Sequence, residues 1–170
     1  MKKLFIILAI LFMVSSMNAK GIKKPFVEIS PRTSLYIDGE TTFGLGCDVI
    51  FNPLRNIGLR VEFVELLFDG GTFFNLNQGF FNTLPSIDAL IYIPMQRFQP
   101  YFFAGFGIST GEGTTSLAIG GGMGFDFSMG RGNILFLEPG IYILSFSNGG
   151  VSDTDVMFRF SAGAKFDILR

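Results

Sequence analysis

The sequence predicts an all-β protein, an eight-stranded antiparallel up-and-down barrel. Hydrophobic residues make up 48% of the 170-residue chain and charged residues only 16%, well below the roughly 25% charge of an average soluble domain. After residue 20 there is no helical periodicity and no apolar run of the ~20 residues that a membrane helix needs. The apolar residues instead alternate with small or polar ones in period two, which is typical of strands with two unlike faces.

The first four expected strands are bounded by turn residues. Residues 25–37 alternate less regularly and end at an Asp-Gly-Glu turn. Residues 41–52 carry Phe, Leu, Cys and Val on one face and mainly glycine on the other, and they end at Asn-Pro. Residues 57–68 and 83–94 alternate Ile, Leu, Ala and Val with residues such as Gly, Arg, Glu and Asp. We expect the long segment between them, residues 69–82, to be a loop.

The last four expected strands show the same alternation. It is noisy in residues 100–110 and 134–147 and clear in residues 116–129, where glycines alternate with apolar residues. It is clearest in residues 156–169, where seven apolar positions alternate with mostly polar or small ones. Compact turns follow the second, fourth and sixth strands, and the longest connections lie on the other side. Short turns on one side and longer loops on the other are typical of outer-membrane barrels.

The first 19 residues have the layout of a secretory signal peptide. Two lysines precede an eleven-residue apolar run, Leu4 to Val14, and small or polar residues follow. The run is too short to cross a ~30 Å bilayer as a helix. We expect cleavage after Ala19, with Ser16 as the other candidate and an uncleaved anchor as the alternative. Residues 1–19 are then the signal peptide and residues 20–170 one outer-membrane β-barrel domain.

Alternation alone does not say whether the apolar face meets lipid or the core of a soluble barrel. Lipid is favoured because the apolar tracks are long and charge is scarce. The other face is rich in glycine, which weakens a solvent-exposed strand but leaves room inside a narrow barrel. The glycines expected to face the interior are Gly44, Gly46, Gly58, Gly105, Gly107, Gly120, Gly122, Gly124, Gly140 and Gly163.

The glycine-bearing face also carries charges of both signs. A charge facing lipid near the middle of the membrane costs about 2–4 kcal/mol, whereas buried charges persist when they are paired and hydrogen-bonded. We therefore predict a charge network in the lumen. Its members are Glu28, Arg32, Asp48, Arg60, Glu62, Asp88, Asp126, Glu138, Arg159, Lys165 and Asp167. Glu65 breaks the alternation after Phe63, and we expect it at the outer rim or at a bulge.

Two segments are similar to those of a known family. Residues Pro100 to Gly107 resemble a Pro-Tyr-x-x-x-Gly-x-Gly strand opening, and Gly163, Phe166 and Ile168 resemble an assembly signal in the last strand. Over residues 22–170 the chain resembles the small OmpA/OmpX-type outer-membrane barrels. The resemblance implies the outer membrane of a Gram-negative-type bacterium, with outer-membrane lipid and the barrel-assembly machinery as partners. We expect a monomer.

The composition excludes several kinds of chemistry. Without histidine, the chain cannot form a Ser-His or Cys-His catalytic pair, on which the lipid-modifying enzymes of the resembled family depend. Cys47, the single cysteine, falls on the lipid-facing track, where it acts as a small hydrophobe. A net charge of −1 provides no basic surface for nucleic acid. We predict a protein that is not an enzyme and holds no cofactor or metal.

Three motifs have simple structural interpretations. Residues 120–124, four of them glycine, lack any phosphate-loop signature and fit a lumen-facing strand. Asp153-Thr154-Asp155 fits a solvated loop better than a cation site. Four phenylalanines flank the longest loop; we expect them to join an aromatic girdle, and the alternative is a mouth for an apolar ligand. They are Phe73, Phe74, Phe80 and Phe81.

These observations favour a non-enzymatic integral outer-membrane barrel with a lumen filled by side chains. It would act in membrane structure and surface interaction. One alternative is a narrow, porin-like conduit or binding barrel for small or hydrophobic molecules. A further alternative is a soluble periplasmic lipocalin-like binding barrel. The direction of Phe158, Phe160 and Phe166 separates the membrane barrel, in which they point outward, from the soluble one.

Overall fold

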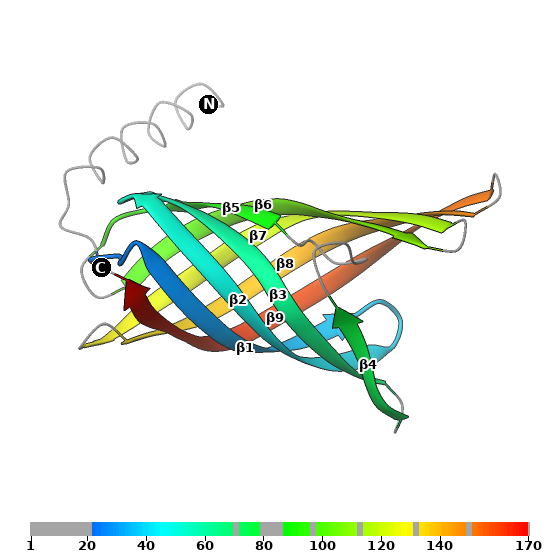
Figure 1. Ribbon diagram of the computed structural model, residues 1–170, viewed down its shortest axis with the longest axis horizontal. Coiled ribbons are helices and arrows are strands. Elements are labelled where there is room, and N and C mark those ends of the chain that lie inside the picture. The colour runs from blue at the N-terminus through cyan, green and yellow to red at the C-terminus, as the bar shows by residue number, and fades with distance from the viewer. Residues whose placement is uncertain are drawn as a thin grey trace, which may run out of the picture.

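The computed structural model describes residues 22–69, 72–78, 87–95, 98–111, 114–130, 133–148 and 151–169. The predicted signal peptide therefore lies outside the described residues. No helix in the described part of the chain is long and apolar enough to cross a membrane. The strands run along a single elongated body (Figure 1). They are β1 (Val27–Ile37), β2 (Thr41–Leu54), β3 (Ile57–Asp69), β4 (Thr72–Gln78), β5 (Ile87–Tyr92), β6 (Phe98–Gly111), β7 (Thr114–Gly130), β8 (Asn133–Asn148) and β9 (Val151–Leu169).

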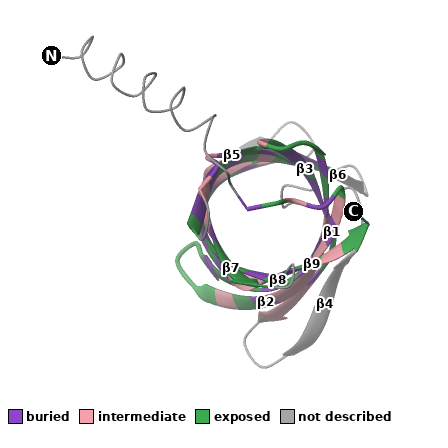
Figure 2. Ribbon diagram, turned by 90° about the vertical axis from the view of Figure 1, so that its left-hand side faces the viewer, coloured by how far each residue is buried: buried purple, intermediate pink, exposed green. Residues whose placement is uncertain are grey.

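Eight of these strands close into a barrel. The hydrogen-bonded order is β2-β1-β9-β8-β7-β6-β5-β3, and β2 also pairs with β3, which completes the ring. Every pairing is antiparallel. The end-on view shows this ring (Figure 2). The predicted fold class, an all-β up-and-down barrel of eight strands, is confirmed.

Strand β4 corrects the prediction of a loop over residues 69–82. It pairs antiparallel with the C-terminal part of β3, with Leu66 opposite Leu76, and lies outside the ring. Alternation missed it because an edge strand needs only a partner with free backbone groups, not two unlike faces. The last strand is also longer than predicted. It begins at Val151, opposite Asn148 of β8, so Asp153 and Asp155 are exposed residues of a strand and not of a loop.

A β-bulge in β3 explains the break in alternation at Glu65. Val64 and Glu62 pair with consecutive residues of β2, so Phe63 is the extra residue. Phe63 and Val64 are 54% and 40% exposed and both point outward, while Glu65 is buried in the lumen. Of the two predicted positions for Glu65, rim or bulge, the bulge is correct.

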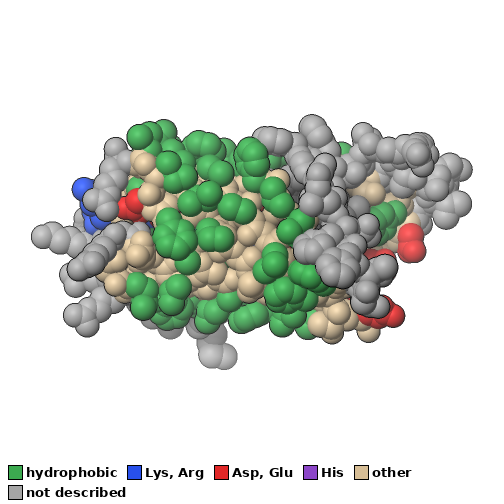
Figure 3. Space-filling model, turned by 60° about the horizontal axis from the view of Figure 1, so that its bottom comes forward, with side chains coloured by type: hydrophobic (Ala, Val, Ile, Leu, Met, Phe, Trp, Pro, Cys, Tyr) green, Lys and Arg blue, Asp and Glu red, His purple; other side chains and the backbone are tan. Residues whose placement is uncertain are grey.

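The apolar face of the barrel points outward. Phe158, Phe160 and Phe166 are 52%, 45% and 40% exposed, whereas Arg159 and Lys165 on the same strand are buried. The space-filling view shows hydrophobic side chains over the body of the barrel and charged ones toward its two ends (Figure 3). A soluble barrel has the opposite arrangement, with apolar side chains inside.

Two phenylalanines lie on the inner face of the barrel and not on the apolar outer face. Phe103 and Phe136 are buried inside the barrel. Each lies directly opposite a glycine on the neighbouring strand, Gly122 and Gly163 respectively. Since glycine has no side chain, the ring occupies the volume left above it. At these two positions the lumen therefore accepts a large ring because a glycine faces it.

Candidate functional site

The barrel interior gathers most of the charged residues that the sequence predicted for it. Ten of the eleven predicted residues are buried, and Asp167, near the end of β9, is half-buried. The buried ten are Glu28, Arg32, Asp48, Arg60, Glu62, Asp88, Asp126, Glu138, Arg159 and Lys165. The contacts divide the buried charges into two groups.

The first group is built around Arg60 of β3. Its Nε donates to Asp88 Oδ2 at 2.6 Å, and its Nη1 donates to Glu138 Oε2 at 2.6 Å. Tyr101 donates its hydroxyl to the same Oε2 atom at 2.7 Å. In the closed strand order, β3 and β8 lie on opposite sides of the ring. The pair of Arg60 and Glu138 therefore spans the lumen.

Arg159 of β9 extends this group toward the outer end. Its Nη1 donates to Glu62 Oε1 at 2.6 Å, and its Nη2 donates to Glu138 Oε1 at 3.3 Å. Glu138 thus accepts from two arginines, one at each carboxylate oxygen. The guanidinium of Arg159 also lies over the Tyr142 ring, 4.6 Å from its centroid. Such a contact is attractive because the ring face is electronegative.

Arg32 of β1 completes the group. Its Nη2 donates to Glu65 Oε2 at 2.6 Å and lies 3.4 Å from Glu62 Oε2, and its Nε donates to Asp48 Oδ1 at 3.3 Å. Tyr36 donates its hydroxyl to Glu65 Oε1 at 2.5 Å. The chain of ion pairs is continuous, and we call it the central network. It consists of Arg32, Asp48, Arg60, Glu62, Glu65, Asp88, Glu138 and Arg159.

A second, smaller group lies at the end of the barrel where the chain enters and leaves. Lys165 Nζ donates to Asp126 Oδ1 at 2.7 Å, and Lys24 Nζ donates to the other oxygen of Asp126. Lys24 also lies 4.0 Å from Glu28 Oε1. We call these four residues the end cluster. Sequence reasoning missed Lys24, because it precedes the first strand, where no alternation marks which side chains point inward.

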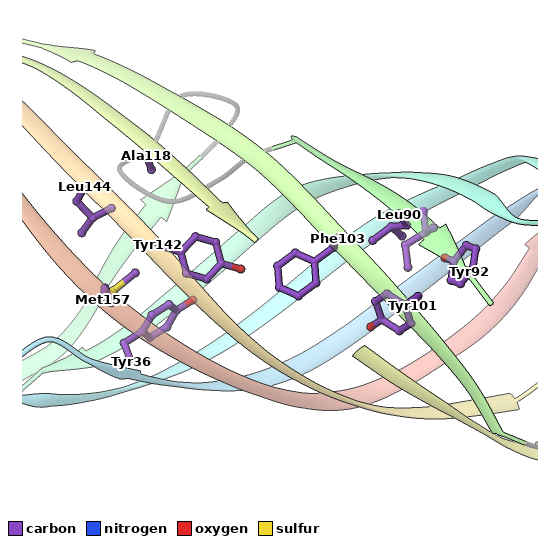
Figure 4. Close-up of a cluster of buried hydrophobic side chains, with 10 residues drawn as sticks. Tyr36, Leu90, Tyr92, Tyr101, Phe103, Ala118, Tyr142, Leu144 and Met157 are labelled. Atoms are coloured by element: carbon purple, nitrogen blue, oxygen red, sulfur yellow. The ribbon is translucent and has the colours of Figure 1, made fainter. Parts of the chain in front are cut away.

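Aromatic rings fill the space between and beyond these charges. All four tyrosines of the chain are buried in the lumen, where the close-up shows them along its length (Figure 4). Tyr101 faces Gly124 and Tyr142 faces Gly120 in the strand register. A Cβ atom at either glycine would overlap the ring opposite it. These two glycines thus make room for the tyrosine rings. The cross-strand register decides which glycine faces which tyrosine.

The remaining predicted residues lie elsewhere. Gly163 faces the lumen against the Phe136 ring, while Phe166 and Ile168 point outward on the last strand. Cys47 is half-buried and unbonded to another cysteine. Phe73 and Phe74 belong to β4, and Phe80 and Phe81 lie outside the described residues.

The arrangement is suited to holding the barrel shut and rigid. Each arginine of the central network bonds carboxylates that come from other strands, so the network ties distant parts of the wall together. Among the side chains that the structure describes, no three of His, Cys, Asp and Glu are grouped to hold a metal ion. The pair of Arg60 and Glu138 and the pair of Arg159 and Glu62 each join strands that are not neighbours in the sheet.

Comparison with known proteins supports the fold. No family model matches the chain, and no curated protein matches it by sequence. Neisserial surface protein A, in its crystal structure, is similar with a TM-score of 0.54 and 11% identity over 84% of this chain and 96% of its own. A chain from the de novo design of transmembrane β-barrels aligns with a TM-score of 0.48 and 12% identity, over 86% of this chain and 98% of its own. The protein shares the architecture of small eight-stranded outer-membrane barrels.

Proposed function

We propose that this protein is a non-enzymatic integral outer-membrane barrel with a closed lumen, which acts in membrane structure and surface interaction. The observation that carries the proposal is the pairing of an apolar outer face with a charged network that spans the interior. The first property suits the protein to lipid, and the second closes the path through it. The outer ends of the strands are then the parts of the protein that remain available for surface interaction.

The outer face supports residence in a membrane. Large hydrophobic side chains from all eight barrel strands are exposed there, among them Leu35, Phe51, Leu59 and Ile143. In water such a surface is far larger than the apolar patches of soluble monomers. Outer-membrane lipid is the partner we propose for it, which disfavours the soluble lipocalin-like alternative. Export by the predicted signal peptide, insertion by the barrel-assembly machinery and a monomeric state complete the proposal.

The central network supports a closed lumen over a conduit. Arg60 and Glu138 bond across the ring, and the tyrosines fill the width around them. An eight-stranded barrel has an interior just wide enough for such side chains. The porin-like alternative needs continuous free volume at the level of these residues, where the side chains are in contact.

Reconstitution into planar lipid bilayers tests the proposal. We expect the refolded protein to require detergent or lipid for solubility and to produce no large conductance steps, while a known porin in the same bilayer produces them. Stable large steps that scale with the amount of protein would overturn the closed lumen. Quantitative recovery of the native protein in buffer without detergent would overturn the membrane assignment.

A further inference from the structure

A short segment crosses the end of the barrel before the first strand begins. We call residues 22–26 the mouth strap. Ile22 donates its backbone N–H to the carbonyl of Met95, beyond β5, at 3.0 Å. At the other end, Asn52 of β2 donates its backbone N–H to Phe26 O at 2.8 Å and its side-chain Nδ2 to Pro25 O at 3.0 Å. In the end-on view this segment runs across the inside of the ring (Figure 2).

The mouth strap directs Lys24 into the barrel and leaves Lys23 outside. The side chain of Lys24 is 1% exposed, bonds Asp126 and lies over the Tyr92 ring, 4.3 Å from its centroid. Ile22 is also buried, whereas Lys23 is exposed. The strap is therefore seated by a buried side chain and by a charge that Asp126 neutralises.

Two polar residues lie next to the contacts that hold Lys24: Gln99 faces Asp126 in the strand register, and the Tyr92 ring lies under Lys24 Nζ. Gln99 is fully buried, yet neither atom of its amide group has a hydrogen-bond partner among the described residues. The Tyr92 hydroxyl, also buried, lacks a partner within the same part of the chain. Burying unpaired polar groups is unfavourable. These groups therefore lower the stability of the state in which the strap covers them.

The strap is also held less firmly than the wall. A barrel strand is bonded along its whole length on both sides, as β8 is to β7 and β9. The contacts named above fix the strap at its two ends and at Lys24. Segments with few backbone bonds open locally at a small fraction of the free energy of global unfolding.

We propose that the mouth strap is a displaceable stopper, latched by the ion pair of Lys24 with Asp126. When it leaves, solvent reaches the layer of Gln99 and Tyr92, while the central network keeps the lumen closed further in. The proposal goes beyond the proposed function and does not depend on it. The recess lies at the end that carries the compact turn after β2, and in outer-membrane barrels the short turns face the periplasm, so it would open toward the periplasm.

Thiol accessibility measures the opening directly. In a Cys47→Ala background, Gln99→Cys places one thiol beneath the strap, and a cationic methanethiosulfonate reagent reports its exposure in detergent micelles. We expect slow labelling with the native strap and labelling about tenfold faster or more in Lys24→Met, because the loss of a buried ion-pair partner removes the latch. Lys23→Met is the matched control, since it removes a charge from the same strap at an exposed position, and it should leave the rate unchanged.

Two further variants keep the test decisive. Ser34→Cys, buried beside Ser161, which lies opposite Glu138 of the central network in the strand register, should remain unlabelled in Lys24→Met. Ile22→Ser weakens the strap without altering the end cluster, and it should accelerate labelling at position 99 even if Lys24→Met does not fold. Equal labelling with and without these strap changes would overturn the proposal, as would acceleration at position 34 that matches position 99.

Discussion

The two faces of the barrel wall follow different rules, although the same strands supply both. On β9, Phe158 and Phe160 point outward, where their side chains need only to be apolar. Between and beyond them, Arg159 and Lys165 point inward, and each bonds a particular carboxylate on another strand. The difference teaches that the outer face depends on a property, apolarity, while the inner face depends on partners. On the outer face, one apolar residue should therefore replace another with little loss of stability. On the inner face, a substitution should be costly wherever it removes a partner from an ion pair.

The largest expected effect is at the centre of the inner face. Arg60→Met leaves Asp88 and Glu138 without the arginine that they share, and breaking a buried ion pair from one side costs about 3–5 kcal/mol. Urea unfolding in detergent micelles, followed by far-UV circular dichroism, measures the change. Arg55→Met, at an exposed position in the turn after β2, is the control and should stay within about 0.5 kcal/mol of the native protein. Equal losses in the two variants would contradict the role of the central network.

The next effect tests the outer face. Phe160→Arg places a charge on the lipid side of β9 and should destabilise the barrel in lipid vesicles by about 2–4 kcal/mol. Phe160→Leu keeps the surface apolar and should cost less than about 1.5 kcal/mol. Both are read from unfolding curves in vesicles of the same composition. If arginine and leucine have the same effect, position 160 does not face lipid.

The smallest effect separates two tyrosines of the inner face. Tyr101→Phe removes a hydrogen bond to the Glu138 carboxylate, and a bond to a charged group contributes about 1.5–3 kcal/mol. The Tyr142 hydroxyl has no hydrogen-bond partner among the described residues, so Tyr142→Phe should change the free energy of unfolding much less. The same urea titration compares them. A larger loss of stability in Tyr142→Phe than in Tyr101→Phe would contradict the hydrogen bond assigned to Tyr101 and Glu138.

Much of the fold could be predicted because alternation is local. Whether a residue points in or out depends on its neighbours one and two positions away, so the strands and the buried charges could be recognised along the chain. Even the bulge left a local trace, the break in alternation at Glu65. Strand β4 left none, because pairing with β3 alone imposes no pattern on its side chains.

The contacts of the candidate site could not be predicted in the same way. Arg60 and Glu138 are 78 positions apart, and their meeting depends on how the strands are staggered when the ring closes. The Phe103 and Phe136 rings fit inside the barrel because register sets a glycine opposite each of them. Lys24 reaches Asp126 because the mouth strap crosses the barrel end, a path that no periodicity describes.

By itself, the sequence determined that this protein is a barrel with an apolar outside and a charged, glycine-rich inside, since period two is a property of consecutive residues. It also determined that histidine chemistry is absent. Only the tertiary structure decided which arginine bonds which carboxylate, which rings fill the lumen and how the mouth strap closes one end. Those outcomes depend on register and closure, which bring together side chains that are distant along the chain.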